Sequence, residues 1–252
     1  MYKTIIQLER CYLDSIKIVV NHDVKDDLLL VYGSFLKQMA TNLNGEIKIN
    51  TVSDATPPEI PRAIIVAKET QILFGLNRIE VELKGMRKHA KRESLHDLYK
   101  HRIKEAEVLI RSYLSYAEFA QGFSGIVAPV RFPQNMEINK NELLNQLHFL
   151  CTGRMNTKLV TFSQKVGLNI DDKFENFEVR EYEVKNVNVS APVTNRPFTL
   201  NLDDFPTVER GIMSVIDVNN KPQATKFDFS NDFAGLVLTF FKAIETFDDY
   251  LR

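Results

Sequence analysis

Tryptophan is absent from this 252-residue sequence, cysteine occurs only twice, and no apolar run is long. Cys11 and Cys151 lie far apart and neither belongs to a CxxC pair, so the sequence contains no zinc or dithiol motif. Two thiols are too few for a secreted disulfide scaffold. No apolar run approaches the roughly 18 residues that a membrane span needs, and Glu9 and Arg10 interrupt the N-terminal segment before a signal-peptide core could form. We therefore expect a cytoplasmic protein that does not enter a membrane.

An excess of charge of one sign is also lacking. The sequence has 32 Lys and Arg against 33 Asp and Glu, a net charge of -1, which gives no overall attraction to nucleic acid or to a membrane surface. The composition, 44% hydrophobic and 26% charged, is typical of a folded globular protein. The 17 Phe and 8 Tyr supply large side chains for a core, and the length suits one large domain or two small ones.

Hydrophobic periodicity predicts an alternation of strands and helices. In the first half we expect a strand within residues 2–20, a helix that ends at Asn44-Gly45, strands at 46–52, 63–66 and 79–84, and a long helix with an apolar stripe over residues 95–117. In the second half we expect a strand at 126–132, a helix at 139–151, strands at 159–166, 177–189, 198–202 and 211–218, and a final helix from residue 230.

Each half therefore has the order strand, helix, three or four strands, long helix. This order predicts an α+β fold of two tandem halves, residues 1–121 and 122–252, each an antiparallel sheet packed on a long helix. The halves would be separate domains or one compact pseudo-duplicated domain. The order of elements resembles that of helix-grip and TATA-binding-like folds, a resemblance of fold that implies no functional residue.

One basic segment stands out between residues 84 and 104, where eight Lys or Arg face only Glu93 and Asp97, a balance of +6 in 21 residues. Such a cluster can contact phosphates, because Lys and Arg release condensed counterions on binding. A charge run is also typical of the solvated face of a helix. Under the first interpretation, the residues predicted to contact an anion or nucleic acid are Arg87, Lys88, Lys91, Arg92, Lys100 and Arg102.

Metal chemistry has two weak candidates. Glu-x-Lys triplets at 46–48, 82–84 and 183–185 lie in strand-like segments, as in nucleases of the PD-(D/E)xK type, but an exposed strand face has the same alternation. Asp97, His101 and Glu105 are spaced i, i+4, i+8 on one helix face and would hold a metal ion or form a salt-bridge ladder. No second His or Cys cluster completes a site, so no metal or cofactor is predicted.

The sequence also contains no complete set of residues for nucleophilic catalysis. His148 and Cys151 share a helix face, but their neighbours are Leu147, Phe149 and Leu150, which is typical of a core helix. The sequence contains no GxSxG, GxxxxGK[ST] or GxGxxG motif. No catalytic residue is predicted.

The final helix has more Phe than a narrow apolar stripe needs. Either it is a deeply buried core helix, or Phe241 belongs to an exposed seam for a partner or for self-association. The sequence as a whole favours a non-catalytic binding or protein-interaction protein. The alternatives are a nucleic-acid-associated protein that uses residues 84–104 and a divergent metal-dependent nuclease.

Overall fold

The computed structural model describes residues 12–24, 28–53, 55–86, 92–117, 121–134, 140–142, 144–145, 163–170, 173–187, 201–220, 233–240 and 242. Its strands are β1 (Tyr12–His22), β2 (Glu46–Ile49), β3 (Ala63–Val66), β4 (Thr70–Phe74), β5 (Arg78–Met86), β6 (Gln121–Pro133), β7 (Ser163–Ile170), β8 (Lys173–Lys185) and β9 (Thr207–Asn220). Its labelled helices are α1 (Leu28–Asn42), α2 (Arg92–Ala117) and the short 3-10 helix η3 (Leu202–Asp204), and residues 233–240 are also helical.

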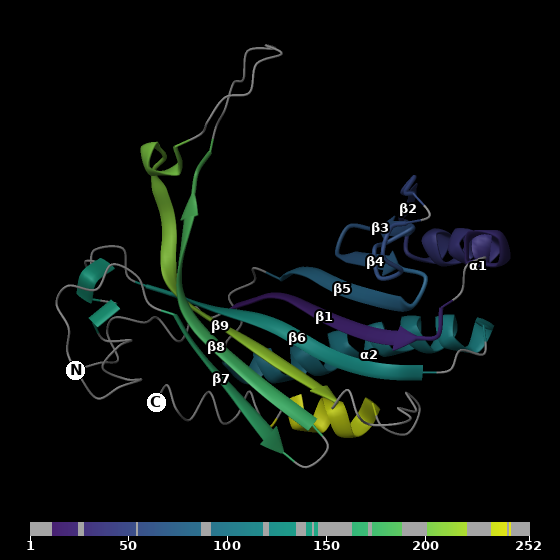
Figure 1. The fold of residues 1–252 in the computed structure, drawn as a ribbon. Helices are drawn as coiled ribbons and strands as arrows, with labels where there is room; N and C mark the ends of the chain where they lie inside the picture. Colours follow the sequence, from purple (N-terminus) through teal and green to yellow (C-terminus); the bar gives the residue numbers. More distant parts are fainter. Residues whose placement is uncertain are drawn as a thin grey trace, which may run out of the picture.

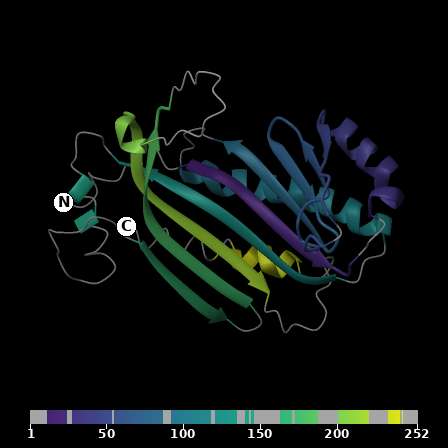
Figure 2. The same cartoon turned by 45° about the horizontal axis from the view of Figure 1, so that its top comes forward.

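All these strands belong to one antiparallel sheet in the order β2-β3-β4-β5-β1-β6-β9-β8-β7 (Figures 1 and 2). Side chains alternate between the two faces of a sheet. On one face, Ile18, Val81 and Ile126 lie side by side in the register of β1, β5 and β6, and all three are fully buried. This face, here called the helix face, packs against α2 and the helical residues 233–240. The opposite side is called the open face.

The core on the helix face is centred on Tyr113 of α2, which is fully buried. Its ring lies 5.4 Å from that of Phe74 and 6.2 Å from that of Phe35, in tilted arrangements that aromatic pairs favour. The Tyr113 hydroxyl lies 3.1 Å from Nε2 of His22, whose Nδ1 donates to the carbonyl oxygen of Asp23 at 2.7 Å. The Tyr113 hydroxyl is thereby hydrogen-bonded inside the core. Ala106, Ile110 and Tyr113, which belong to the described part of the apolar stripe predicted for the long helix, are buried as expected.

The prediction of two halves, each with its own sheet and long helix, is wrong. Strand β1 pairs with β5 on one side and with β6 on the other, and β6 continues to β9. Strands from both halves of the chain are therefore neighbours in a single sheet, and their buried apolar side chains form one cluster. The order of elements along a sequence does not reveal which distant strands pair, and here the first strand occupies the middle of the sheet. The division of the chain at residue 121 stays a prediction.

Most individual elements agree with the sequence. Helix α1 ends at Asn42, and Asn44 has a positive φ of 49°, as the Asn-Gly pair predicts. Strand β3 has the predicted bounds, whereas β4 was not predicted and β7 lies four residues beyond the expected strand. Residues 202–204 form η3 in place of the end of a strand. No helix among the described residues has the length and apolarity needed to cross a bilayer.

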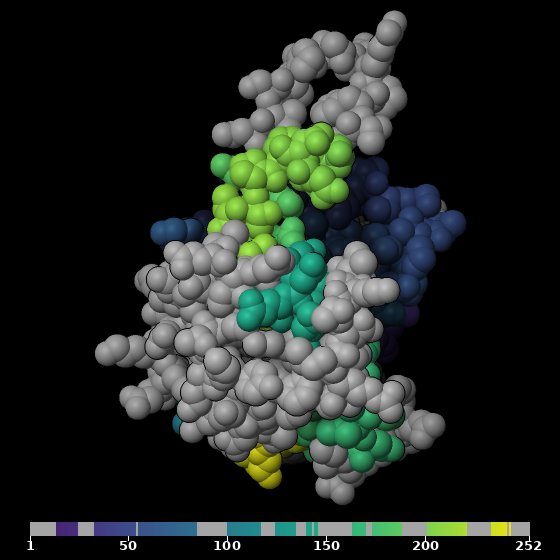
Figure 3. Space-filling view, turned by 90° about the vertical axis from the view of Figure 1, so that its left-hand side faces the viewer, coloured from purple at the N-terminus to yellow at the C-terminus, as the bar shows by residue number. Residues whose placement is uncertain are grey.

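Strands β8 and β9 continue past the end of β6 as a two-stranded arm. The last pair between β6 and β9 is Pro133 with Gly211, but β8 and β9 pair further, to Lys185 and Thr207. Figure 3 shows the yellow-green atoms of η3 and the start of β9 standing above the body of the molecule. A side chain at Gly211 would overlap the carbonyl oxygen of Phe132, so glycine permits the close approach of β6 where the arm departs.

Candidate functional site

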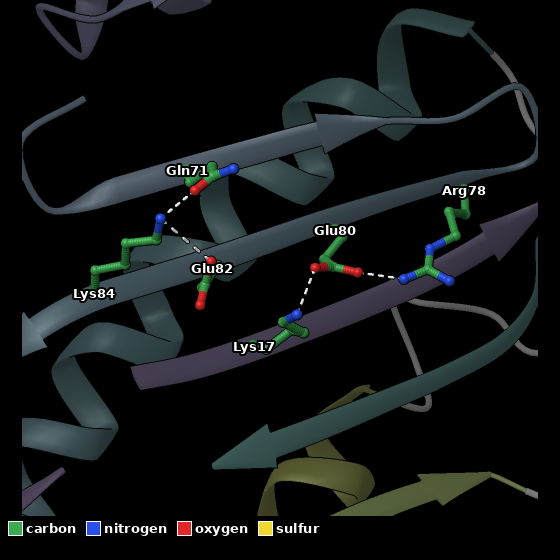
Figure 4. A network of polar contacts seen from close by, with 6 residues as sticks. All are labelled: Lys17, Gln71, Arg78, Glu80, Glu82 and Lys84. Carbon is green, nitrogen blue, oxygen red and sulfur yellow. Dashed lines mark hydrogen bonds and ion pairs between the residues drawn. The ribbon is translucent and has the colours of Figure 1, made fainter. Parts of the chain in front are cut away.

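The open face carries a charged network centred on Glu80 of β5 (Figure 4). One carboxylate oxygen accepts from Lys17 Nζ of β1 at 2.8 Å, and the other accepts from the guanidinium of Arg78. The Glu80 side chain is only 7% exposed, whereas those of Lys17 and Arg78 are 38% and 32% exposed. A buried carboxylate requires charged or hydrogen-bonding partners, and each oxygen of Glu80 has a cationic one.

The alternation of β5 explains how these side chains come to the open face. Ile79, Val81 and Leu83 are buried on the helix face, so the residues between them point the other way. In the register, Glu80 lies opposite Val19 and Glu82 lies opposite Lys17. The bond from Lys17 to Glu80 is therefore a diagonal cross-strand contact, which a long side chain can reach.

A second, more exposed group of polar side chains lies further along β5. Lys84 hydrogen-bonds Gln71 of β4 and lies 3.6 Å from the Glu82 carboxylate (Figure 4). The Lys84 side chain is 47% exposed. Exposed pairs of this kind contribute little to stability, so the network is strongest at Glu80.

A cavity of about 210 Å³ adjoins Glu80. It is lined by Glu59, Ile60, Pro61, Leu73, Gly75, Arg78 and Glu80. The volume is below the roughly 300–1,000 Å³ of pockets for drug-sized ligands. The cavity therefore suits a single side chain or a small group, and both apolar and charged side chains line it.

Hydrogen bonds to backbone carbonyl groups hold the wall of this cavity in place. Leu76 N donates to the carbonyl oxygen of Pro58 at 2.7 Å, and Asn50 Nδ2 donates to that of Pro61 at 2.9 Å. A side chain at Gly75 would come within 2.9 Å of the Pro58 carbonyl oxygen. Glycine at this position thus lets the proline-containing segment lie directly against the end of β4.

Apolar side chains border the network on its other side. Val127 of β6 lies opposite Lys17, and Pro129 lies opposite Val215 of β9. These three apolar residues are half-buried on the open face. The charges around Glu80 are therefore flanked by apolar surface on both sides, from Leu73 to Val215.

The predicted basic residues do not contribute to this site where the structure describes them. Arg102 donates to Glu105 Oε2 at 2.6 Å and to the carbonyl oxygen of Glu69 at 3.3 Å, and its side chain is 11% exposed. It thereby attaches α2 to the turn between β3 and β4. Lys100 is exposed, as are its helix neighbours His101 and Lys104.

Several predicted positions cannot be placed. Arg92 is the first residue of α2, but its side chain is outside the described part of the molecule. The same holds for the side chain of Asp97. The other candidates lie wholly outside the described residues: Arg87, Lys88, Lys91, His148, Cys151 and Phe241. Their predicted roles stay predictions.

Several of the described candidate metal ligands lie beside residues of opposite charge. His101 Nε2 lies 3.3 Å from Glu105, and within one Glu-x-Lys triplet Lys185 Nζ lies 3.3 Å from Glu183. The triplet of Glu82 and Lys84 has the same arrangement on the open face. Within the described part of the chain, no three His, Cys, Asp or Glu side chains gather as a metal site would require.

Two carboxyl groups of β8 have shifted pKa values. A hydrogen bond from Lys140, whose Nζ lies 2.9 Å away, lowers the pKa of Glu183, and Lys185 adds to the effect. Burial raises the pKa of Glu175, an effect that the charge of Lys242 partly opposes. Both groups belong to the environment of β8 and not to the network at Glu80.

Sequence reasoning predicted β5 but missed Lys17, Arg78 and Glu80 as a group. The alternation of β5 showed which residues share a face, but only the pairing of β1 with β5 brings Lys17 to Glu80. The cavity was missed because β4, which contributes Leu73, was not predicted. Comparison with known proteins adds no assignment to this site: no protein-family model matches the sequence, and no curated protein matches it.

Proposed function

We propose that this chain is a non-catalytic binding protein that recognises a polypeptide segment with the open face of its sheet. The cavity beside Glu80 carries this proposal. It would anchor one apolar side chain of the partner against Ile60, Pro61 and Leu73. Anchor residues that fill pockets on the partner dominate the binding energy at many protein interfaces.

The charged groups suit recognition better than catalysis. Both oxygens of Glu80 are occupied by cations, so this carboxylate is not placed to act as a general base. A guanidinium has five N–H donors, and Arg78 directs one nitrogen to Glu80 while its side chain stays 32% exposed. The remaining donors can bind a backbone carbonyl oxygen of the partner.

The rim of the cavity adds an acceptor. Glu59 is exposed and makes no ion pair with any other described residue. A partner segment with an apolar side chain, a carbonyl oxygen for Arg78 and a nearby Lys or Arg for Glu59 would satisfy all three features. The half-buried apolar residues of β6 and β9 extend the same surface across the sheet.

Site-specific photo-crosslinking tests this proposal. A photoreactive phenylalanine analogue is placed at Ile60, 41% exposed on the cavity wall, and for comparison at Val108, 58% exposed on α2. We expect one protein to be captured at Ile60 and not at Val108 in cells that produce the chain. That protein is then purified and titrated against the wild type, Leu73→Asp and Arg78→Glu.

Both substitutions should weaken binding at least about tenfold, the size of effect expected of an anchor residue and a charged contact. Far-UV circular dichroism checks that the variants are folded. The same proteins captured at both positions, or unchanged affinity in both variants, would overturn the proposal.

The nucleic-acid alternative depends on a different surface. Lys100 and Lys104 are exposed one turn apart on α2, and neither makes an ion pair with a described residue. They continue the basic segment that begins at residue 84. This surface is separate from the cavity, so salt-dependent retention on DNA distinguishes the two functions.

A further inference from the structure

The two edges of the sheet differ in how they are protected. Strand β2, at one edge, is four residues long and carries Glu46 and Lys48. Short, charged edge strands are a common way to prevent pairing with another chain. Strand β7, at the opposite edge, is eight residues long (Figures 1 and 2). Its length alone gives it more unpaired backbone than β2.

Strand β7 also has few of the sequence features that protect an edge. Its register with β8 runs without a bulge from Ser163 to Ile170, and it contains no proline. Val166 and Leu168 are 41% and 42% exposed on the helix face, and Lys165 is the one charged residue in the strand. Among the described residues, β8 is the only strand paired with β7. A long, regular edge with exposed apolar side chains is suited to pair with a further strand.

We propose that a second copy of this chain pairs with β7, edge to edge and antiparallel, about a two-fold axis at Gly167. This register places Val166 opposite the partner's Leu168, and Leu168 opposite the partner's Val166. It extends the row that begins with Phe177 of β8, which lies opposite Val166. The apolar side chains exposed at the edge would thereby be buried against each other.

The charges of the strand are compatible with this self-pairing. Lys165 would lie opposite the partner's Asn169, so the two lysines do not face each other.

The size of the contact predicts a weak dimer. Seven paired residues at about 3.3 Å each and a sheet thickness of about 10 Å give an interface of about 230 Å² per copy. This is below the roughly 600–1,000 Å² per partner of stable complexes. The chain should therefore be mostly monomeric when dilute and increasingly dimeric as its concentration rises.

Cysteine crosslinking of the full chain tests the pairing and its register. In a background with Cys11→Ser and Cys151→Ser, one protein carries Lys165→Cys and a second carries Asn169→Cys. The register predicts that oxidation of their mixture gives a covalent dimer at least about fivefold more abundantly than either protein alone, because only the mixture puts the thiols within disulfide distance. Glu46→Cys mixed with Lys48→Cys supplies the matched control at the opposite edge.

Sedimentation provides the second measurement. The weight-average mass of the wild type should rise between about 10 μM and about 500 μM, as a weak affinity implies. Val166→Lys combined with Leu168→Lys should abolish this rise while the chain remains folded by circular dichroism. Equal crosslinking in the mixture and in the single proteins, or a constant monomeric mass at both concentrations, would overturn the proposal.

Discussion

Replacing Glu80 with Gln tests whether the charged network on the open face stabilises the fold as a buried ion pair does, or contributes as little as an exposed one. The substitution keeps the shape of the side chain but removes the carboxylate that pairs with both Lys17 and Arg78. Both cations would then lose this counter-charge. We expect a loss of stability because all three side chains are mostly buried, so water cannot fully replace the lost carboxylate.

The magnitude follows from the burial of the three side chains. Removing one partner of a fully buried ion pair costs about 3–5 kcal/mol, and an exposed pair contributes about 0–1 kcal/mol. Glu80 is 7% exposed, but Lys17 and Arg78 are about one-third exposed and can partly rehydrate. An intermediate cost of about 1.5–3 kcal/mol is therefore expected for Glu80→Gln.

Glu82→Gln is the matched control, because Glu82 lies two residues further on the same strand and face. Its ion pair with Lys84 is longer, at 3.6 Å, and more exposed, so its loss should cost less than about 1 kcal/mol. Urea unfolding of both variants gives the comparison, with an unchanged m-value as the condition for comparing midpoints. If Glu80→Gln lowers the free energy of unfolding no more than Glu82→Gln does, the network at Glu80 does not act as a buried ion pair.

Three further predictions concern β8, the arm and α2. Glu175→Gln should stabilise the chain at neutral pH, because burial raises the pKa of Glu175. Glu183→Gln should destabilise it, because Lys140 and Lys185 hold the pKa of Glu183 below its ordinary value of 4.5. Gly211→Ala should cost more than about 2 kcal/mol, because the new methyl group would overlap the backbone of β6. Lys100→Ala with Lys104→Ala should leave retention on DNA unchanged at two salt concentrations if the sheet face is the binding surface.

The pH dependence gives each carboxyl prediction its own check. The advantage of Glu175→Gln should appear as pH rises above about 4.5, the ordinary value, and level off above the raised pKa in the folded protein. The deficit of Glu183→Gln should be full above pH 4.5 and disappear as pH falls through the lowered pKa. Differences that do not change with pH would contradict both assignments.

Controls for the other two predictions lie within the chain. Gly33→Ala in α1 meets no atom within 4 Å, so it should stabilise the helix by about 0.5–1 kcal/mol, in contrast to Gly211→Ala. A gain or neutral result at Gly211 would contradict the close approach of β6. Loss of DNA retention on removal of the two α2 lysines would support the nucleic-acid alternative instead of recognition by the sheet.

Local structure could largely be predicted because it depends on residues near each other in the sequence. The stripe of Ala106, Ile110 and Tyr113 specified both α2 and its buried side. The Asn44-Gly45 pair specified where α1 ends. Strand β4 escaped prediction because its apolar run, Ile72 to Phe74, is too short for periodicity to distinguish it from a loop.

The arrangement of the elements could not be predicted in the same way. Nothing local to β1 indicates that it lies between β5 and β6, and this central position turns two expected halves into one sheet. The pairing of β1 with β5 brings Lys17 to Glu80. As a result, the Glu80 carboxylate is buried, although β5 has the alternating pattern of an ordinary strand. The site thus depends on contacts between residues 63 positions apart, which composition and spacing do not encode.

The proposed function requires that the open face, and not α2, binds the partner. The most direct measurement is the affinity of the protein captured at Ile60 for two charge reversals, Arg78→Glu on the cavity and Lys104→Glu on α2. If the open face binds the partner, Arg78→Glu should weaken binding at least about tenfold and Lys104→Glu should change it less than about twofold. The reverse order of effects would contradict it.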